Sequence, residues 1–149
     1  MKKLSETYKE LGIAFKFPIK IKDSNGNGTY FEDSTGFSYN KEYNADGNET
    51  YYENSYGYWC KSEYDANGNQ TYCNNSTGHW CKYEYDSNNN KTYYETSDGF
   101  WYKKEYNSDG EVTYHENSYG DKKGTPRSAK TCEGKVIEVD GIKYELKAL

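Results

Sequence analysis

The sequence predicts an all-β protein, an antiparallel meander of five 21-residue β-hairpin repeats with a short N-terminal helix and a C-terminal hairpin. The first observation behind this prediction is a fixed period, which is the mark of a repeat architecture. Between Asp23 and Gly120, residues of one type recur every 21 positions. The clearest columns are Tyr43, Tyr64, Tyr85 and Tyr106; Thr29, Thr50, Thr71, Thr92 and Thr113; Tyr30, Tyr51, Tyr72, Tyr93 and Tyr114; Ser34, Ser55, Ser76, Ser97 and Ser118; and Gly36, Gly57, Gly78, Gly99 and Gly120.

The second observation is the composition of the repeats. Between Asp23 and Gly120, Val112 is the single Val, Ile, Leu or Met, whereas the chain has 19 tyrosines. A conventional two-layer core cannot be built from this stretch, so we expect cross-strand aromatic pairs and hydrogen-bonded ladders to stabilise it. The mean hydropathy of −1.27 is low, but disordered chains are poor in aromatic residues and this chain is 18% aromatic. The sequence therefore predicts a folded array.

Each repeat contains two short strands and two tight turns. In one copy, residues 79–85 form a predicted strand, residues 86–90 a turn, residues 91–95 the returning strand and residues 97–99 the next turn. Turn sequences such as Asp-Ala-Asn-Gly-Asn at 65–69 are typical of a type I turn followed by a glycine in the left-handed region. Asn89 replaces that glycine in one copy, and asparagine is the next-best residue for this conformation.

The segments on either side of the array differ from it. Residues 1–22 are predicted to be an N-terminal cap, with a helix over residues 1–12 that Ser5 would cap and an edge strand over residues 13–21 that Pro18 interrupts. The array covers residues 23–120. Residues 121–134 are predicted to be a polar linker, and residues 135–149 a C-terminal hairpin around Asp140–Gly141. Because the sheet has open edges and aromatic residues on both faces, we expect a homodimer.

The charge is distributed unevenly along the chain. Residues 23–120 carry a net charge of −11, residues 1–22 carry +4 and residues 121–149 carry +2. An acidic array argues against direct binding of nucleic acid and favours a protein partner with a basic surface.

The sequence also bears on the compartment. No apolar run is long enough to span a bilayer and residues 1–15 lack the apolar segment of a signal peptide, so we expect a cytoplasmic protein without membrane contact. The four cysteines, Cys60, Cys73, Cys81 and Cys132, are then expected to be reduced thiols. Cys60 and Cys81 share a column with tyrosines, which is typical of a packing position.

The unit YDANGNQTYCNNSTGHWCKYEYD at 64–86 resembles the YD-repeat family, also called the RHS-repeat family. It has the Tyr-Asp pair, a Gly-Asn turn, a second glycine and the next Tyr-Asp at the 21-residue period. This chain has Asn44 and Asn107 in place of the aspartate and Lys22 in place of the first tyrosine. In large members of the family, the resemblance implies a spiral of hairpins that encloses a toxin or meets a cell surface. The short, free-standing form is similar to proteins of phages and prophages.

Catalytic and metal sites are not predicted, and no cofactor is expected. Asp-x-Asn-Gly-Asn loops such as Asp65–Asn69 are similar to half of a calcium loop, but no glutamate closes a twelve-residue loop and these residues are standard in turns. His79 lies near Cys73 and Cys81 with a spacing unlike that of zinc fingers, and both histidines stand in aromatic columns. We therefore expect His79 to pack and the protein to be a non-enzyme.

The candidate binding residues are carboxylates and indoles that recur with the repeat. They are Glu42, Glu63, Glu84 and Glu105 in one column, Glu53, Glu95 and Glu116 in a second, and Trp59, Trp80 and Trp101 in a third. One interpretation is a solvated face on which Lys61, Lys82 and Lys103 pair with neighbouring acids. The other is a recognition surface for a basic groove, because rows of carboxylates mimic nucleic acid and aromatic side chains are efficient interface anchors.

These observations favour a non-enzymatic binding protein that blocks or sequesters a macromolecular partner. The most specific hypothesis is a phage-encoded inhibitor, acting in the host cytoplasm on a nucleic-acid-handling defence complex such as CRISPR. One alternative is a carbohydrate- or cell-surface-binding YD-repeat module that uses the three tryptophans as stacking platforms. Another alternative is a structural spacer.

Overall fold

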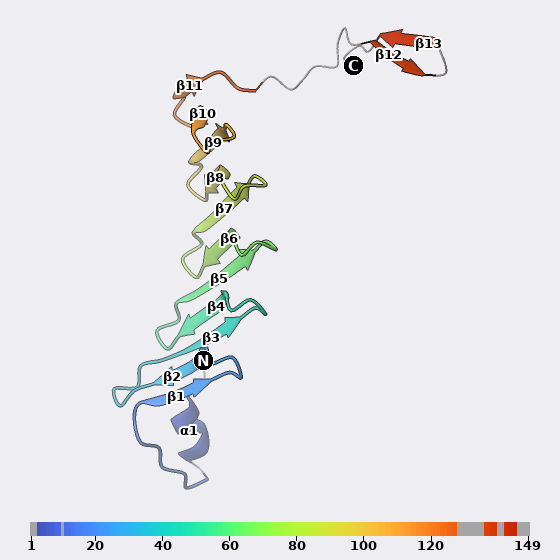
Figure 1. The fold of residues 1–149 in the computed structure, drawn as a ribbon. Helices are drawn as coiled ribbons and strands as arrows, with labels where there is room; N and C mark the ends of the chain where they lie inside the picture. The colour runs from blue at the N-terminus through green and yellow to red at the C-terminus, as the bar shows by residue number, and fades with distance from the viewer. Residues whose placement is uncertain (1–2, 10, 128–135, 140–141, 146–149) are drawn as a thin grey trace.

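The computed structural model describes residues 3–9, 11–127, 136–139 and 142–145. Its main feature is one antiparallel sheet of eleven strands whose spatial order follows the chain from β1 to β11 (Figure 1). The strands are β1 (Ile19–Lys22), β2 (Gly28–Glu32), β3 (Ser38–Tyr43), β4 (Glu49–Asn54), β5 (Trp59–Tyr64), β6 (Gln70–Asn75), β7 (Trp80–Tyr85), β8 (Lys91–Thr96), β9 (Trp101–Tyr106), β10 (Val112–Asn117) and β11 (Lys122–Gly124). The predicted meander of hairpins is confirmed.

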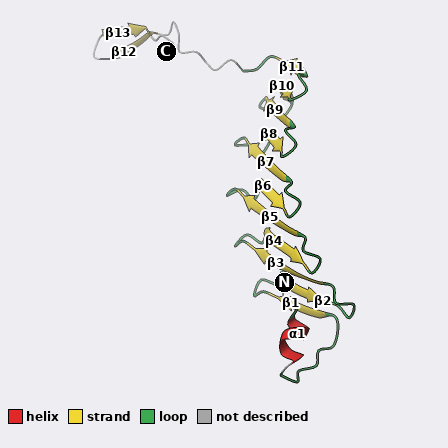
Figure 2. Ribbon diagram, turned by 180° about the vertical axis from the view of Figure 1, so that it is seen from behind, coloured by secondary structure: helices red, strands yellow, loops and turns green. Residues whose placement is uncertain are grey.

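The ends of the sheet differ from the predicted boundaries. Helix α1 spans Leu4–Lys9 and lies at the β1 end of the sheet (Figure 2). The first strand begins at Ile19, directly after Pro18, whose missing N–H cannot join the ladder. Strand β11 lies in the segment predicted to be a linker, where its backbone pairs with β10 although it continues no repeat motif. Strands β12 (Val136–Val139) and β13 (Ile142–Glu145) pair in a separate two-stranded sheet.

The hairpin turns have the predicted geometry. In the turn after β5, the N–H of Gly68 donates to the carbonyl of Asp65 at 3.1 Å, and the N–H of Asp65 donates to the carbonyl of Asn69 at 2.9 Å. Gly68 has a φ of 82°, and Asn89 takes the same left-handed conformation with a φ of 63°. The prediction that Asn89 takes the left-handed conformation in place of a glycine is therefore confirmed.

The repeated tyrosines at the ends of the strands join successive hairpins. The hydroxyl of Tyr64 donates to the carbonyl of Glu49 at 3.0 Å, and that of Tyr85 donates to the carbonyl of Gln70 at 3.0 Å. Tyr43 and Tyr106 make the same bond to residues 15 positions earlier. Each of these phenols therefore binds the last strand of the preceding hairpin, which is paired directly with its own strand, a contact that we call the tyrosine latch.

A second latch, made by the repeated serines, lies at the opposite edge of the hairpins. The N–H of Ser76 donates to the carbonyl of Trp59 at 2.9 Å, and its hydroxyl accepts from the N–H of Trp59 at 3.3 Å. The N–H groups of Ser55, Ser97 and Ser118 donate in the same way to the first strand of their own hairpin. The tyrosine column thus joins consecutive hairpins, and the serine column closes each hairpin at the opposite end of its strands.

The two sides of the sheet carry different side chains. One side, the aromatic face, carries rings and thiols of alternate residues: Phe31, Tyr39, Tyr52, Cys60, Cys73, Cys81, Tyr94, Tyr102 and His115. Neighbouring rings are in contact, with centroids 5.3 Å apart for Phe31 and Tyr39 and 5.4 Å apart for Tyr94 and Tyr102. Among the described residues, the buried apolar side chains are only Ile19, Cys81 and Tyr114. The sheet is therefore stabilised without a conventional core, as predicted.

Removing one tyrosine latch will lower stability without changing the ring that packs. We expect Tyr64→Phe to reduce the free energy of unfolding by about 0.5–1.5 kcal/mol, because the carbonyl of Glu49 loses its donor. Urea denaturation measures this change. The control is Tyr56→Phe, since Tyr56 is 81% exposed and lies in a turn, and it should match the wild type. Equal stability of the two variants would contradict the role of the latch.

Candidate functional site

The other side of the sheet, the glutamate face, carries all of the predicted binding residues. The register places Glu53 opposite Trp59, Glu95 opposite Trp101, and Asn74 opposite Trp80. It also places the second set of glutamates opposite tyrosines, with Glu42 facing Tyr51, Glu63 facing Tyr72, Glu84 facing Tyr93 and Glu105 facing Tyr114. Both glutamate columns and all three tryptophans therefore lie on one surface.

The glutamate face contains a shallow cavity that recurs with the repeat. Each copy has a glutamate, a threonine, a tyrosine and a lysine in its lining: Glu42, Thr50, Tyr51 and Lys61 in the first; Glu63, Thr71, Tyr72 and Lys82 in the second; Glu84, Thr92, Tyr93 and Lys103 in the third. The second also includes Tyr83, and the third extends over Lys104, Glu105, Tyr114, Glu116 and Pro126. The cavity volumes are about 330, 380 and 470 Å³. Equivalent cavities are two strands apart, which corresponds to a spacing of about 10 Å.

The lysines of this face make two kinds of contact. Lys82 forms the ion pair expected from the sequence, with its Nζ atom 2.9 Å from a carboxylate oxygen of Glu84. The Nζ atoms of Lys61 and Lys103 instead lie over indole rings, 5.8 Å from the centroid of Trp59 and 5.6 Å from that of Trp101. Because these two lysines stack on aromatic rings, the ion-pair interpretation describes only part of the face.

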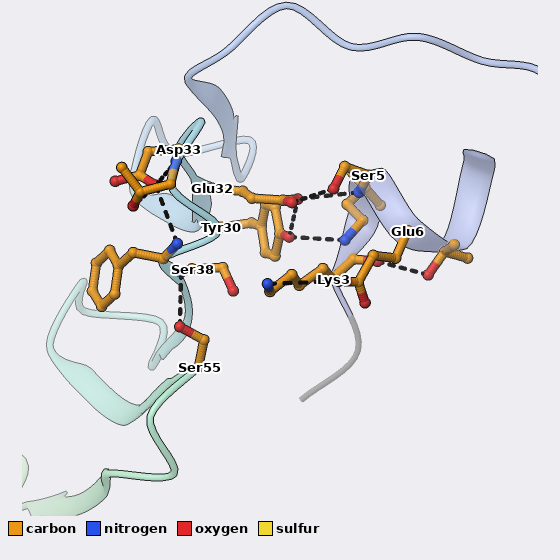
Figure 3. A network of polar contacts seen from close by, with 12 residues as sticks. Lys3, Ser5, Glu6, Tyr30, Glu32, Asp33, Ser38 and Ser55 are labelled. Atoms are coloured by element: carbon orange, nitrogen blue, oxygen red, sulfur yellow. Dashed lines mark hydrogen bonds and ion pairs between the residues drawn. The ribbon is translucent and has the colours of Figure 1, made fainter.

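At the β1 end of the sheet, the start of the chain docks on the glutamate face (Figure 3). Tyr30 donates from its hydroxyl to Glu32 at 2.7 Å and accepts from the N–H of Leu4 at 2.9 Å. Glu32 also accepts from the N–H of Ser5 at 3.1 Å and from the Ser5 hydroxyl. Its side chain is 1% exposed. Burial raises the pKa of Glu32, but the hydrogen bonds from Ser5 and Tyr30 outweigh it, so that the net pKa is lowered.

This docking was not predicted from the sequence, where Ser5 was expected to cap α1. Glu32 belongs to the same column as Glu53, Glu95 and Glu116, so its position in the repeat gives no sign of a different role. The distinguishing residue is Ser38, which stands opposite Glu32 at a position that tryptophan occupies in the next three repeats. A small residue at this position leaves space for the N-terminal segment above Glu32.

A second segment of the chain contacts the glutamate face at its other end. The N–H of Arg127 donates to a carboxylate oxygen of Glu105 at 2.6 Å, and its guanidinium donates to the carbonyl of Tyr106 at 2.9 Å. Pro126 lines the neighbouring cavity together with Glu105. At both ends of the sheet, backbone N–H groups beside a basic residue therefore bind a glutamate of this face.

Three cysteines, Cys60, Cys73 and Cys81, lie on the aromatic face together with His79, and the fourth, Cys132, lies outside the described residues. Cys81 is 5% exposed and stands opposite Cys73, as expected for a packing position, and Cys60, Cys73 and Cys81 are free thiols. Burial and the neighbouring Cys81 raise the pKa of Cys73. His79 was expected to pack, but it is exposed, because it stands at the edge of the turn before β7. Its Nε2 lies 3.3 Å from Cys81 Sγ, and its Nδ1 lies 3.1 Å from the Ser97 hydroxyl.

The Asp-x-Asn-Gly-Asn loops use their carboxylates within the turn. One oxygen of Asp65 accepts from the N–H groups of Asn67 and Asn69, both at 2.9 Å, and the other accepts from the Asn69 side chain at 3.0 Å. The side-chain hydrogen bond from Asn69 is the main cause of a lowered pKa of Asp65. These carboxylates therefore close turns. In the described part of the chain, no group of three His, Cys, Asp or Glu side chains is arranged to hold a metal ion.

The fold, but not the sequence, is similar to parts of much larger solved structures. No protein-family model matches the chain, and no curated protein matches it either. The Photorhabdus luminescens Tc holotoxin pore with a mutated TccC3 aligns with a TM-score of 0.55 and 17% identity, over 67% of this chain and 5% of that one. The crystal structure of TcdB2-TccC3-Cdc42 aligns with a TM-score of 0.52 and 16% identity, over 78% of this chain and 6% of that one. At these identities the likeness shows the fold alone.

The matched chains are far longer than this one. The protein spans about one-twentieth of the length of the Tc toxin chains with which it aligns. Among the described helices, none has the length and apolar character needed to cross a membrane.

The thiols will react in an order set by burial and by pKa. In a Cys132→Ser background, we expect Ellman's reagent at about pH 8 to modify Cys60 before Cys73 and Cys81, because the thiolate is the reactive form. Cys81 is 5% exposed, and the raised pKa of Cys73 reduces its thiolate fraction. Peptide mass spectrometry over time measures the order. In urea all three should react together, and labelling of Cys81 first in the folded protein would contradict the structure.

The docking of the N-terminal segment will depend on pH. A carboxylate whose pKa is lowered on folding contributes stability above its unfolded value of about 4.3 and loses it as the pH falls through the folded value. We therefore expect hydrogen-exchange protection of the Leu4 and Ser5 amides to be full at neutral pH and to be lost in acid, as the pH falls through the lowered pKa of Glu32. NMR measures it at both amides. Glu32→Gln should remove most of it at pH 7, whereas equal protection of both amides in this variant and in the wild type at pH 7 would disprove the role of the Glu32 carboxylate.

Proposed function

We propose that this protein is a non-enzymatic binding protein, which blocks or sequesters a protein with a basic surface through its glutamate face. The observation that carries the proposal is the concentration of charge on that one surface. Its described strands carry seven carboxylates outside the N-terminal dock, Glu42, Glu53, Glu63, Glu84, Glu95, Glu105 and Glu116, against four lysines, Lys61, Lys82, Lys103 and Lys122. An excess of acid on a rigid sheet attracts a basic partner and steers its approach.

The tryptophans and tyrosines of the same face support the proposal. Trp59, Trp80 and Trp101 are all partly exposed, and they alternate with carboxylates along the sheet. Aromatic side chains of this kind supply most of the energy of many interfaces, while surrounding charges select the partner. The glutamate face therefore combines aromatic side chains that can anchor a partner with carboxylates that select a basic one.

The chain's own ends support binding of basic segments. Lys3 precedes the residues that dock on Glu32, and Arg127 binds Glu105 through its backbone. The nearby charge of Lys3 also contributes to lowering the pKa of Glu32. These contacts are intramolecular examples of the chemistry proposed for the partner.

We prefer a binding function to catalysis because Cys81, the thiol that stands beside a histidine, is buried. Cys81 lies 3.3 Å from His79, a distance that would suit a nucleophile and its base. Its 5% exposure keeps a substrate from the sulfur atom. The exposed features of the chain are instead those of a recognition surface.

Within this class, the partner that we propose is a nucleic-acid-handling protein, whose basic groove the rows of carboxylates would occupy. The specific form of the proposal is a phage-encoded inhibitor of a host defence complex of the CRISPR type. The relation to the YD-repeat family is also proposed, since the fold is similar to that of Tc toxin chains, which contain RHS-repeat shells. The small size of the sheet favours a surface that blocks a partner over one that encloses it.

Carbohydrate binding is the second candidate, and the repeated cavities are the observation that favours it. Each cavity combines a tyrosine with charged groups at a spacing of about 10 Å, and tyrosine and tryptophan rings stack on sugars. Salt separates the two candidates, since contacts between exposed charges are screened and stacking is not.

Neutralising one glutamate column will weaken binding of a basic partner. Captured on beads, the full chain should retain a basic protein from host lysate at about 0.05 M salt and release it at about 0.5 M. The triple variant Glu63→Gln, Glu84→Gln, Glu105→Gln should lose most of this capture. Its control, Asp46→Asn, Asp109→Asn, Glu111→Gln, removes the same charge from exposed turns and should retain the partner. Undiminished capture by the first variant would refute the proposal, and salt-resistant capture that an oligosaccharide competes away would favour the carbohydrate function.

A further inference from the structure

The N-terminal dock has a specific chemistry that its residues define. Tyr30 and Glu32 stand two positions apart on β2, so that both project from the glutamate face, and they are hydrogen-bonded to each other at 2.7 Å. Together they accept two consecutive backbone N–H groups, from Leu4 and Ser5, and the Ser5 hydroxyl. Lys3 lies beside them, with its Nζ 2.8 Å from the position a Cβ atom would take at Gly36 (Figure 3).

The same arrangement of tyrosine and glutamate recurs along the glutamate face, and we call each copy a Tyr–Glu pair. The copies are Tyr51–Glu53 on β4, Tyr93–Glu95 on β8 and Tyr114–Glu116 on β10. In each copy burial raises the pKa of the tyrosine, and the neighbouring carboxylate raises it further, which places the two groups within reach of each other. The remaining repeat has Asn74 two positions after Tyr72 and therefore lacks the carboxylate.

The first of these copies faces a cavity that the docked segment itself borders. This cavity has a volume of about 530 Å³, and α1 lines one side of it through Leu4 and Thr7. The other side is lined by Glu42, Tyr51 and Glu53. A second peptide segment placed on the Tyr51–Glu53 pair would therefore lie alongside α1, which occupies the preceding pair.

We propose that the Tyr–Glu pairs of the later repeats dock segments of the partner protein that have the chemistry of residues Lys3–Ser5. Such a segment offers two consecutive free backbone N–H groups, a hydroxyl side chain and a lysine, as found where a helix begins with Lys-x-Ser. The inference rests on the proposed protein-binding function and specifies what the partner presents. Opposite Glu53 and Glu95, the indoles of Trp59 and Trp101 replace Ser38 and supply an apolar contact for the side chain between the lysine and the serine, whereas Glu116 stands opposite Lys122.

Charge complementarity favours this partner over a second copy of the chain. The array carries a net charge of −11, so two arrays brought face to face would repel each other. A basic segment is attracted, and Arg127 provides a second example, because its N–H donates to Glu105 on the same face.

The test uses the full-length chain, labelled with ¹⁵N, and an acetylated synthetic peptide of residues 1–12 as the probe. NMR titration should show saturable shifts at the amides of Tyr51 and Glu53, with smaller or no shifts at Tyr72 and Asn74. Glu53→Gln should weaken binding at this pair at least about tenfold, because a hydrogen bond to a charged acceptor is lost. A peptide with Ser5→Ala should weaken it similarly. Glu111→Gln, in an exposed turn, is the matched control and should bind as the wild type does.

A gain of binding provides the second arm. Asn74→Glu restores the missing carboxylate beside Tyr72, and we expect new shifts at this repeat that the wild type does not show. Shifts confined to Tyr30 and Glu32 would mean that the peptide only exchanges with the chain's own N-terminus, and this result would overturn the inference. Concentration-dependent self-association of the chain that Glu53→Gln abolishes would overturn it too, because the occupant would then be a second copy.

The outcome can be separated from that of the proposed function. If the peptide fails to dock but glutamate-dependent capture of a basic protein persists, the inference is wrong and the function stands. If the peptide docks as expected but no basic protein is captured, the Tyr–Glu pairs bind such segments and the blocking function is wrong.

Discussion

The structure depends on hydrogen bonds that join each hairpin to the next. A single layer of short strands has little apolar surface to bury, and in this protein the tyrosine and serine latches secure both ends of consecutive hairpins. The tyrosine latch supplies a side-chain donor to a carbonyl of the preceding hairpin, and the serine latch supplies a backbone donor to a carbonyl of its own hairpin. The array is therefore stabilised through nearest-neighbour contacts, as repeat proteins generally are, and its surfaces are free to carry charge instead of a core.

Much of the fold could be predicted because it follows from local chemistry. The turn residues, including Asn89 in the left-handed conformation, and the alternation of faces depend on neighbouring positions in the sequence. The latches could not be predicted, since the acceptor of Tyr64 lies 15 residues earlier and its identity depends on register. Strand β11 was missed for another reason. Lys122–Gly124 has no repeat motif, and an edge strand needs only backbone groups to pair.

The candidate site was predictable to a similar degree. Because side chains alternate along a strand, the sequence alone places Trp59 on the same face as Glu63. That the second glutamate column lies on this face follows only from the pairing of Glu53 with Trp59 on the neighbouring strand. The contacts of the lysines, the exposure of His79 and the docking at Glu32 depend on three-dimensional neighbours that periodicity does not specify. A repeated motif conceals such differences, because copies with the same residues can have different partners. The one signal of the docking that is visible in the sequence is Ser38, which stands where the next three repeats have tryptophan.

Because the latches connect only neighbouring strands, the sheet can be lengthened or shortened by whole repeats. An insertion or deletion of one whole 21-residue unit preserves each latch and both faces, because the turns and acceptors return in phase. A shift by one residue instead moves every side chain to the opposite face. Since the cavity recurs in three consecutive copies, the valency of the surface would grow with the number of repeats. Evolution of such a chain can thus adjust avidity for an extended partner in single steps, without redesigning any contact.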